Sequence, residues 1–581
     1  MRYRLSLPEP HAHLFHVEVE IDRPGEGAEV VFPVWTPGSY LVREFARHVE
    51  QASADDGAGR ALPLERLDKH RLRVDARGAA RAVLRYRVYA NELTVRTAHL
   101  DGTHAYLNPA AVLPFVRGRE GERHVLAVDA PAGWSVATAL EGGPAEFSAR
   151  DYDELADSPV EIGTHRTLRF EALGVPHEIA LWGRGNLDEV AFVADARRIV
   201  EVVGGLMGGL PYRRYLFVVH LADKRRGGLE HAASTTLQVA RSGFFPRKAY
   251  EETLGLLAHE FFHVWNVKRL RPAAFVPFDY TREQYTRLLW WFEGATSYYE
   301  QVALARAGLQ PPKRWLEALG EALTTLERSP GARKTSVEES SFLAWVKLYR
   351  PDENTPNSTI SYYLKGELVA LALDLALRRA GRSLDDLLRA LYERHAQGGV
   401  PEDGVERIAA ELLGEAAARR FFDRFVRGTE PLELDLDVVG LRLRRRAASG
   451  LEDKGGTLAK GEDGKPPAGW LGIELGSGPK LTVAAVREGS PAQRAGLYAG
   501  DELVAEDGFR LERGTLWDRL CERGPGGRLR LTAFRRDELV DVEVVLGTLP
   551  EDTIWLEPVA EPTAAQRAAF EAWAAAPWPF P

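Results

Sequence analysis

The sequence predicts a multidomain α+β protein, and three observations support this prediction. Residues 1–170 alternate apolar and polar residues in short runs separated by Gly, Pro and Asp, a pattern that favours a β-rich domain. Between about residues 248 and 427 the apolar residues recur at helical spacing, which indicates a mostly helical region. Residues 447–468 are rich in Gly, Lys, Glu and Asp, as expected of a flexible linker before a further domain.

Length and composition narrow the class of protein. At 581 residues the chain is long enough for roughly four domains, and 45% hydrophobic residues can form substantial cores. A net charge of −9 gives no general attraction for nucleic acid or anionic membranes. We see no signal peptide or membrane-spanning run and expect a cytoplasmic protein. The single cysteine, Cys521, excludes an internal disulfide and a thiolate metal cluster.

The β-rich region contains a rigid aromatic segment, Phe32–Tyr40, with the sequence F-P-V-W-T-P-G-S-Y. Two prolines and a glycine restrict its backbone, so we interpret it as a packed turn in preference to a substrate-contacting loop. Residues 171–446 form the next predicted domain. It opens with strand-like runs such as Arg214–Leu221, followed by G-G-L-E-H at Gly227–His231. The two glycines permit close approach of a ligand, and Glu230 beside them is suited to holding a cation. The alternative is a simple glycine turn with an exposed glutamate.

The sequence H-E-F-F-H follows within a predicted helix. His259 and His263 lie one helical turn apart, so both imidazoles can face one metal ion, and Glu260 is placed to act as a base for a bound water. Zinc is the expected ion, with three protein ligands and one position for water. The elongated version of this pattern, with a glycine and a third histidine, is excluded because Asn266 and Arg269 occupy those places.

A carboxylate from elsewhere must therefore supply the third zinc ligand. The best candidate is Glu293, because aromatic and aliphatic residues recur at helical spacing from Tyr285 to Leu304 and predict a second long helix. Glu283 and Glu300 compete for this role. Glu300 lies two turns after Glu293 and suits a supporting role, in which it accepts a hydrogen bond from a ligand imidazole.

These motifs resemble those of the gluzincin metallopeptidases, and specifically the glycyl aminopeptidase family with a carboxy-terminal PDZ domain. The resemblance rests on H-E-x-x-H, on E-G-x-T-x-Y-Y from Glu293 and on W-T-P-G-S-Y in the amino-terminal region. It implies a thermolysin-like catalytic domain. The connector between His263 and Glu293 is longer than in the related alanyl-type aminopeptidases.

The resemblance also implies roles for two further residues. G-G-L-E-H resembles the G-x-M-E-N motif of the related aminopeptidases, in which the glutamate holds the free amino group of the substrate; here that residue is Glu230. The segment Y-L-K-G resembles their Y-x-K-G motif, in which the tyrosine donates a hydrogen bond to the oxyanion. The corresponding donor is Tyr363, with Tyr362 as the competitor.

Residues 469–548 resemble a PDZ domain. G-W-L-G-I resembles its carboxylate-binding loop, formed here by Trp470, Leu471, Gly472 and Ile473, and S-P-A-Q-R-A-G-L-Y-A-G-D from Ser490 resembles its helix signature. Such domains add a peptide to a sheet edge and capture its terminal carboxylate. Residues 549–581 form a tail with a predicted helix at 563–575, which is expected to dock on either the PDZ groove or the catalytic domain.

We therefore expect a zinc aminopeptidase, with one zinc ion per chain, acting on peptides with a free amino terminus. Preference for amino-terminal Gly or Ala is implied by the resemblance alone. One alternative is a zinc endopeptidase guided by the PDZ domain, and another is a PDZ-based binding protein with structural zinc. The PDZ domain would bind a protein carboxy terminus, and neither nucleic acid nor membrane is an expected partner.

Overall fold

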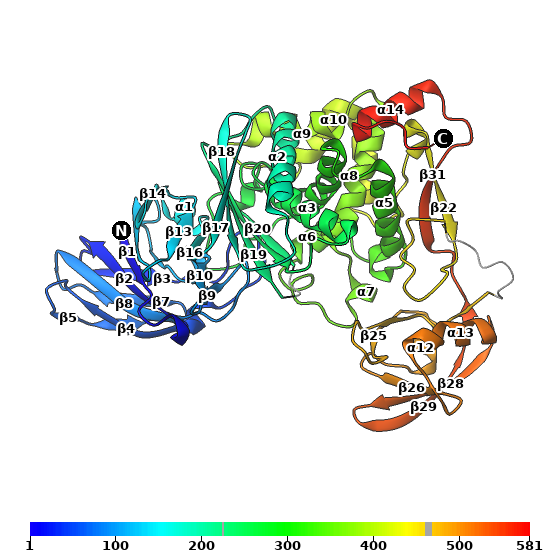
Figure 1. Cartoon of the computed structure of the whole chain (residues 1–581), viewed down its shortest axis with the longest axis horizontal. Coiled ribbons are helices and arrows are strands. Elements are labelled where there is room, and N and C mark those ends of the chain that lie inside the picture. Colours follow the sequence, from blue (N-terminus) through cyan, green and yellow to red (C-terminus); the bar gives the residue numbers. More distant parts are fainter. Residues whose placement is uncertain (224–225, 459–466, 581) are drawn as a thin grey trace. The chain divides into compact units, whose positions relative to one another are not determined.

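The computed structural model describes residues 1–223, 226–458 and 467–580 (Figure 1). Contacts divide the chain into two compact units. The first comprises Met1–Thr286, Tyr299–Leu309 and Leu388–Gly404, and the second comprises Arg287–Tyr298, Gln310–Leu387 and Val405–Pro581. None of the helices in the described ranges combines the length and apolar character needed to cross a bilayer. The cytoplasmic location stays a prediction.

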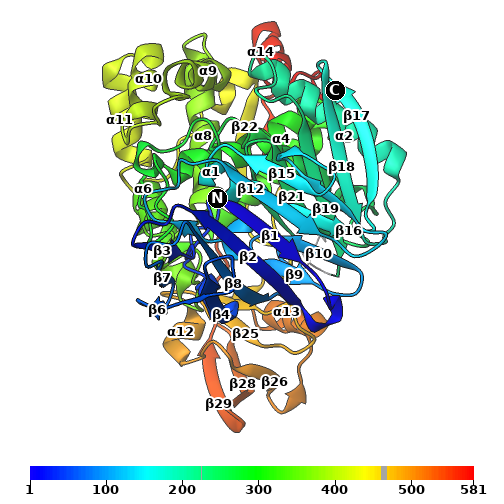
Figure 2. The same cartoon turned by 90° about the vertical axis from the view of Figure 1, so that its left-hand side faces the viewer.

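The amino-terminal region is β-rich, as its alternating pattern predicts. Its largest sheet has eight strands in the order β14-β15-β12-β1-β2-β8-β4-β5, and Figure 2 labels its strands β1, β2 and β8. In β2 every second residue is buried, so one face meets the core while the other meets solvent. The strands are β1 (Arg2–Ser6), β2 (Leu14–Asp22), β3 (Gly27–Val31), β4 (Val49–Asp55), β5 (Ala61–Leu62), β6 (Leu64–Arg66), β7 (Arg71–Asp75), β8 (Arg81–Tyr89), β9 (Ala98–Leu100), β10 (His104–Leu107), β11 (Phe115–Val116), β12 (His124–Asp129), β13 (Ser135–Thr138), β14 (Glu141–Gly142), β15 (Glu146–Ala149) and β16 (Val160–Gly163), with the short helix α1 (Tyr152–Ala156) before β16.

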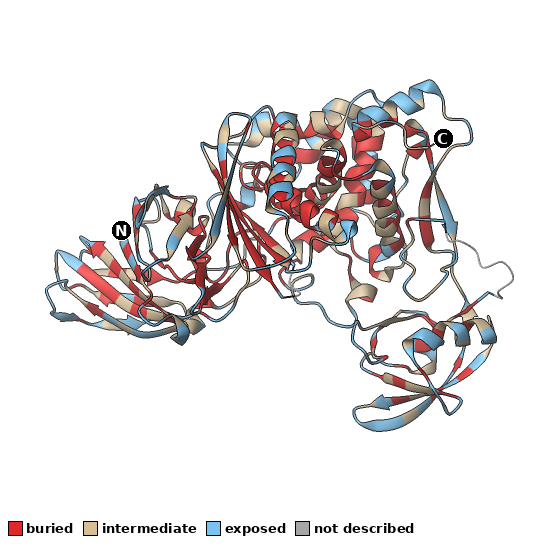
Figure 3. Ribbon diagram, viewed as in Figure 1, coloured by how far each residue is buried: buried red, intermediate tan, exposed pale blue. Residues whose placement is uncertain are grey.

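A five-stranded sheet follows, in the order β17-β18-β19-β21-β20. Its central strand β19 (Tyr215–Ala222) is buried along its whole length, because parallel neighbours flank it on both sides (Figure 3). The predicted strand at Arg214–Leu221 is thereby confirmed within one residue. The other strands are β17 (Arg166–Ala172), β18 (Val175–Trp182), β20 (Gly227–Glu230) and β21 (Ser234–Ala240), and α2 (Glu189–Leu206) precedes β19.

The helix that carries H-E-x-x-H is α3 (Arg247–Phe262), and every residue from Thr253 to Phe262 in it is buried. The second long helix expected at Tyr285–Leu304 is wrong in its first half. Residues 281–288 form no helix, a π-helical turn η5 spans Trp290–Ala295, and a regular helix α4 spans Thr296–Arg306. Apolar residues at helical spacing cannot distinguish α from π winding, because both present a continuous buried stripe.

The rest of the middle region is helical, as its apolar spacing predicts. Its helices are α5 (Pro312–Glu327), α6 (Val337–Phe342), α7 (Thr355–Ser358), α8 (Tyr362–Arg379), α9 (Leu384–His395), α10 (Gly404–Leu413) and α11 (Glu415–Phe425). The helical periodicity of residues 404–425 is divided between two helices, α10 and α11. Gly414 separates them with a φ of +87°, a left-handed conformation that glycine adopts without strain.

Residues 468–549 build a small core of their own in the second unit. Its elements are β23 (Gly469–Trp470), β24 (Ile473–Leu475), β25 (Val483–Val486), α12 (Pro491–Ala495), β26 (Glu502–Glu506), β27 (Phe509–Arg510), α13 (Arg513–Arg523), β28 (Arg528–Arg535), β29 (Glu538–Val545) and β30 (Gly547–Thr548). The chain returns along β31 (Thr553–Pro558), which pairs with β22 (Leu441–Arg446).

The carboxy-terminal helix α14 (Ala564–Ala574) docks on helices of the catalytic region within the second unit. Trp573 is fully buried, its indole N–H donates to Tyr298 Oη at 2.7 Å, and its ring lies 4.3 Å from that of Trp315. Tyr298 in turn donates to the carboxylate of Asp374 at 2.7 Å. Of the two docking surfaces that the sequence leaves open for the tail, the structure selects this one.

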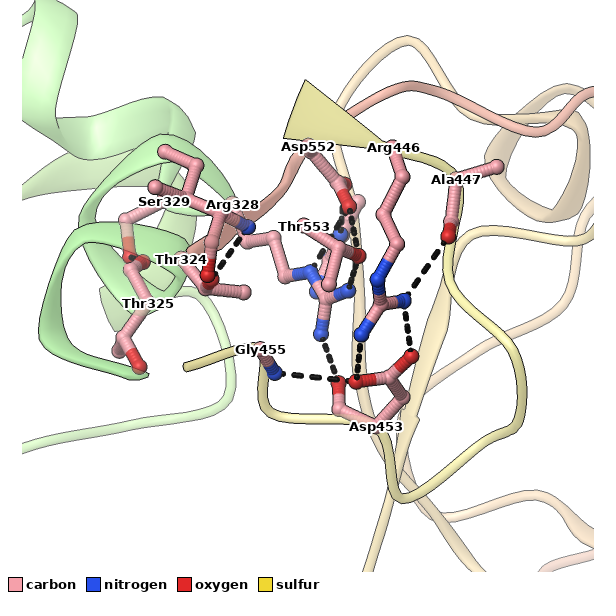
Figure 4. Close-up of polar contacts among 12 residues, drawn as sticks. Thr324, Thr325, Arg328, Ser329, Arg446, Ala447, Asp453, Gly455, Asp552 and Thr553 are labelled. Carbon is pink, nitrogen blue, oxygen red and sulfur yellow. Dashed lines mark hydrogen bonds and ion pairs between the residues drawn. The ribbon is translucent and has the colours of Figure 1, made fainter. Parts of the chain in front are cut away.

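The segment after β22, expected to be a flexible linker, makes defined contacts over its first half. Asp453 accepts hydrogen bonds from Arg446 and from the backbone N–H of Gly455, and Arg328, which directly follows α5, donates to its carbonyl (Figure 4). The backbone N–H of Ser449 also donates to the Asp453 carboxylate. Burial would raise the pKa of Asp453, but these bonds hold it well below its ordinary value. Composition alone misses such contacts because it does not reveal tertiary partners. Residues 459–466 lie outside the described ranges.

Candidate active site

The two histidines of α3 occupy one buried face, as their spacing predicts. The side chains of His259 and His263 are nearly inaccessible, and their ring centroids lie 4.8 Å apart. Residues at i and i+4 of a helix point the same way, so two imidazoles can meet one ion from this face.

Second contacts fix which imidazole nitrogen faces the site. The Nδ1–H of His263 donates to the backbone carbonyl of Asn266 at 2.6 Å, and Nδ1 of His259 lies 3.4 Å from Glu300 Oε2. Both Nε2 atoms are therefore left for a metal, which is how metal-binding histidines are normally held. Asn266, which breaks the elongated motif, thus serves the site through its backbone. Gly255 makes the contact of Glu300 possible, because a Cβ there would overlap Glu300 Oε1.

Glu293 lies within the π-helical turn η5 and is 2% exposed. Glu293 belongs to the second unit, whereas His259 and His263 belong to the first, so its role as the third ligand stays a prediction. The glycine after Glu293 has a packing role, because a Cβ on Gly294 would lie 2.5 Å from the Cα of Gly366 in α8. The E-G and K-G sequences are therefore halves of one close backbone contact.

Gly228, the second glycine before Glu230, has a role that the sequence does not predict. A Cβ at Gly228 would overlap the carboxyl group of Glu260, so this glycine admits a side chain of the site itself. Gly38, in the W-T-P-G-S-Y segment, has a φ of +87°, and a Cβ there would overlap Glu230 Oε1 and lie 2.6 Å from Oε2. The segment is thus a packed turn, as predicted, and it packs against Glu230.

Glu230 ends strand β20 and is 3% exposed. Its Oε1 atom has no hydrogen-bond partner in the described parts of the chain. One carboxylate oxygen from each of Glu230 and Glu260 and one nitrogen of His263 lie within 4.8 Å of one another. A buried carboxylate oxygen without a partner is energetically unfavourable and is suited to receiving a cation.

Sequence reasoning missed the residues that hold this region together. Asp157 accepts hydrogen bonds from His231 Nδ1 at 3.0 Å and from the backbone N–H of Ala232 at 2.8 Å, and it pairs with Lys268 at 2.7 Å. Burial would raise the pKa of Asp157, but Lys268 and His231 hold it far below its ordinary value. The ion pair ties the chain after Glu230 to the chain after His263. Nothing in the local sequence around Asp157 signals this role.

A second buried group of histidines and a carboxylate lies where β10, β16 and β19 meet. Nδ1 of His104 lies 3.1 Å from Glu161 Oε1, and Nε2 of His220 lies 2.8 Å from Oε2. His104 also stacks on Trp182, with centroids 3.6 Å apart. The other nitrogens, His104 Nε2 and His220 Nδ1, have no partner among the described residues.

Comparisons with known proteins agree with this geometry. Residues 2–164 match the Peptidase M61 N-terminal domain, and residues 252–369 match the M61 glycyl aminopeptidase family. An aminopeptidase N family protein from Idiomarina loihiensis is 32% identical over 99% of both chains, with a TM-score of 0.92.

The chain belongs to the M61 glycyl aminopeptidase family. It is therefore an enzyme, a zinc aminopeptidase. Two weaker likenesses add little to this M61 assignment. An M1 zinc metallopeptidase from Deinococcus radiodurans is 16% identical over 74% of this chain and 95% of its own, and its TM-score of 0.48 carries no argument. A probable periplasmic serine endoprotease, DegP-like, from Hahella chejuensis is 32% identical over 105 residues, which are 16% of this chain and 22% of that relative.

The side chains of this M61 protein fit zinc. Two neutral imidazoles and one carboxylate are a donor set that zinc prefers and that leaves a position open for water. The contacts of His263 with Asn266 and of His259 with Glu300 keep both Nε2 atoms free of protons, as metal binding requires. The second histidine group fits less well, because no described residue offers its outer nitrogens the acceptors that ligand imidazoles need.

Proposed function

We propose that the protein removes amino-terminal residues from peptides, with zinc held by His259, His263 and Glu293 and the substrate amine held by Glu230. One observation carries this proposal: the buried Oε1 atom of Glu230 has no hydrogen-bond partner among the described residues. Glu230 lies close to Glu260 and His263, so this atom is near the expected zinc site. An ammonium group of a peptide would supply the missing partner. An endopeptidase has no need of such an anchor, because the chain continues through its site.

Glu260 acts as the general base in this proposal. Zinc, when bound, would activate the attacking water and polarise the scissile carbonyl. Glu260 takes the proton of the water and passes it to the leaving amine. Gly228 leaves room for the carboxylate to lie against β20, so that Glu260 and Glu230 face the same space. Glu300 orients His259 and does not itself meet the substrate.

Tyr363 is the proposed oxyanion donor. Tyr362 and Tyr363 begin α8, and their rings stack with centroids 4.9 Å apart. Tyr362 is completely buried, whereas Tyr363 is partly exposed, and a group that meets substrate needs such access. Exposure therefore favours Tyr363 over its neighbour. Removing a donor of this kind lowers turnover by on the order of 10²–10³.

We further propose that residues 469–548 form a PDZ domain that binds a protein carboxy terminus. The strand β24 pairs on one side with β25, and no strand of the described chain pairs with its other edge. The preceding loop, Trp470–Ile473, turns at Gly472 with a φ of +81°, and a Cβ there would overlap that of Ser490. An open edge beside such a loop supports peptide addition to the sheet.

Preference for amino-terminal Gly or Ala rests on the family alone.

Hydrolysis of glycyl- and alanyl-anilides beside their N-acetylated forms tests the aminopeptidase proposal. We expect cleavage of the free-amine substrates only, and loss of cleavage with a zinc chelator. Glu230→Gln should lower kcat/KM by about 30-fold or more, because breaking a buried charge pair costs about 2–5 kcal/mol. Glu252→Gln, an exposed position on the same α3 helix, is the matched control. Cleavage of acetylated substrates would instead establish an endopeptidase, and inertness toward both would favour a binding protein.

A further inference from the structure

A cavity in the second unit lies apart from every residue assigned above. Its volume is about 440 Å³, and it is bounded by the end of α5, by residues 429–437, by β22 and by the first turn of α8. Half of its lining residues are aliphatic, and the other half are polar or charged. The aliphatic side chains include Leu323, Leu326, Leu432, Leu434, Leu443 and Ile554.

One cation lies at the wall of this cavity. Lys365 of α8 is 2% exposed, and its ammonium group has one hydrogen bond, to the carbonyl of Ala332 at 3.3 Å. An ammonium group has three N–H donors. In the described chain, two donors of a buried charge are thus without an acceptor. Leaving them so is unfavourable, because a buried donor loses its water without replacement.

The other charged residues around the cavity already have partners of opposite charge. These ion pairs are Glu327–Arg333, Glu430–Arg424, Asp435–Arg379, Arg442–Glu557 and Arg445–Glu327. Asp437 lies 3.8 Å from Arg379. Within the ranges that the structure describes, Lys365 is the charged lining residue without such a partner. The uncompensated charge of the cavity is therefore positive.

Lys365 keeps most of its charge near neutral pH. Burial lowers its pKa to about 8, which still lies above pH 7. The cavity thus presents a fixed ammonium beside these aliphatic side chains under ordinary conditions. Water could occupy the space near the ammonium, but the leucine side chains offer it no hydrogen bonds.

We propose that this cavity binds an aliphatic monocarboxylate, with the carboxylate on the Lys365 ammonium and the alkyl chain along the leucine side chains. A carboxylate supplies acceptors for the two unused N–H donors and neutralises the charge. The alkyl chain gains by removing aliphatic surface from water. This site is separate from the proposed peptidase function and does not depend on it.

Calorimetric titration of the zinc-loaded full-length protein with octanoate tests the proposal. Octanamide, which has the same chain and no charge, is the matched ligand. We expect octanoate to bind at least tenfold more tightly than octanamide. Lys365→Met should remove that preference, because only the charged head group loses its partner. Lys347→Met, at an exposed lysine that does not line the cavity, should leave the affinity unchanged.

A second variant guards against effects of Lys365 on folding or on the neighbouring Tyr363. Leu443→Trp in β22 fills part of the cavity and should weaken octanoate and octanamide alike. Equal affinity for octanoate and octanamide in the wild type, no measurable binding of either octanoate or N-acetyl-Leu-Leu, or octanoate binding that is unchanged in both variants would overturn the proposal. The dipeptide N-acetyl-Leu-Leu also has a carboxylate beside aliphatic groups, but on a peptide. Lys365-dependent binding of this dipeptide and not of octanoate would assign the site to peptide carboxy termini. Lys365-dependent binding of octanoate and not of the dipeptide would assign it to fatty acids.

Discussion

The protein buries histidines beside carboxylates in two places. One group lies around His259 and His263 on α3, and the other joins His104 and His220 through Glu161. Both are inaccessible, and both have ligand atoms within 4.8 Å of one another. They differ in the contacts of their other imidazole nitrogens. In the α3 group these nitrogens meet Asn266 and Glu300, whereas in the second group they meet nothing described.

This difference teaches where to look for a metal site. A ligand imidazole needs its other N–H satisfied, and the α3 group provides an acceptor for each. In the second group both imidazoles use their bonded nitrogen as donor to Glu161, and the remaining bare nitrogens carry no proton that needs an acceptor. That arrangement suits a carboxylate held by two neutral imidazoles, which together join two sheets. The distances between potential ligand atoms do not by themselves distinguish the two groups as metal sites.

Metal analysis of two variants tests whether the α3 group binds zinc and the Glu161 group does not. His263→Ala should reduce bound zinc from one ion per chain to nearly none, because two protein ligands do not hold the ion. His104→Gln should leave one zinc per chain. Zinc is counted by elemental analysis after dialysis. A second ion in the wild type, lost in His104→Gln, would contradict our interpretation of the Glu161 group.

The base beside the α3 group has no counterpart in the second group. Glu260→Gln should lower kcat by about 10²–10⁴-fold while zinc content stays at one per chain, because general-base catalysis contributes on this order. Steady-state hydrolysis of alanyl-anilide measures the effect. Retention of wild-type turnover would remove Glu260 from the mechanism. Glu252→Gln is again the matched control on α3.

Acid should weaken the second group through His104. Burial lowers the pKa of His104 to about 4 from 6.5. The unfolded chain therefore takes up a proton near pH 6.5 that the folded protein takes up only near pH 4. The stability that this residue contributes is complete above pH 6.5 and falls by about 3 kcal/mol as the pH drops toward 4.

Urea unfolding of wild type and His104→Gln at about pH 7 and pH 4.5 measures this contribution. The free energy of unfolding should fall less with acid in the variant than in the wild type. Equal losses in the two proteins would mean that His104 does not carry the acid sensitivity. Zinc content at pH 7 serves as the control, because it should be the same in both.

Of the four predicted effects, we expect that of Glu300 to be the smallest. Glu300→Gln keeps the shape of the side chain and weakens its hold on His259 Nδ1, so zinc affinity should fall by about 10–100-fold. Competition with a chromogenic chelator measures it. Glu317→Gln, at a partly exposed position on α5, is the control. An unchanged affinity would show that Glu300 does not orient the ligand imidazole.

Much of the site follows from local sequence. The spacing of His259 and His263 on a helix places both on one face, and the apolar run at Arg214–Leu221 predicts a strand, because periodicity is a local property. The strand β20, which ends at Glu230, was not predicted. The π-helical turn at Glu293 was not predictable, since its extra residue per turn leaves the apolar pattern intact. The contact of Gly228 with Glu260 was not predictable either, because the two residues are remote in sequence.

The sequence by itself determined the H-E-x-x-H helix, the β-rich amino-terminal region and the family resemblance, because each depends on residues a few positions apart. The tertiary structure decided which partners complete them. Asp157 with Lys268, Gly38 beneath Glu230 and Trp573 beside Tyr298 are contacts between residues separated by more than a hundred positions. Such contacts form only when the chain has closed long loops, and composition and periodicity carry no information about which residues then meet.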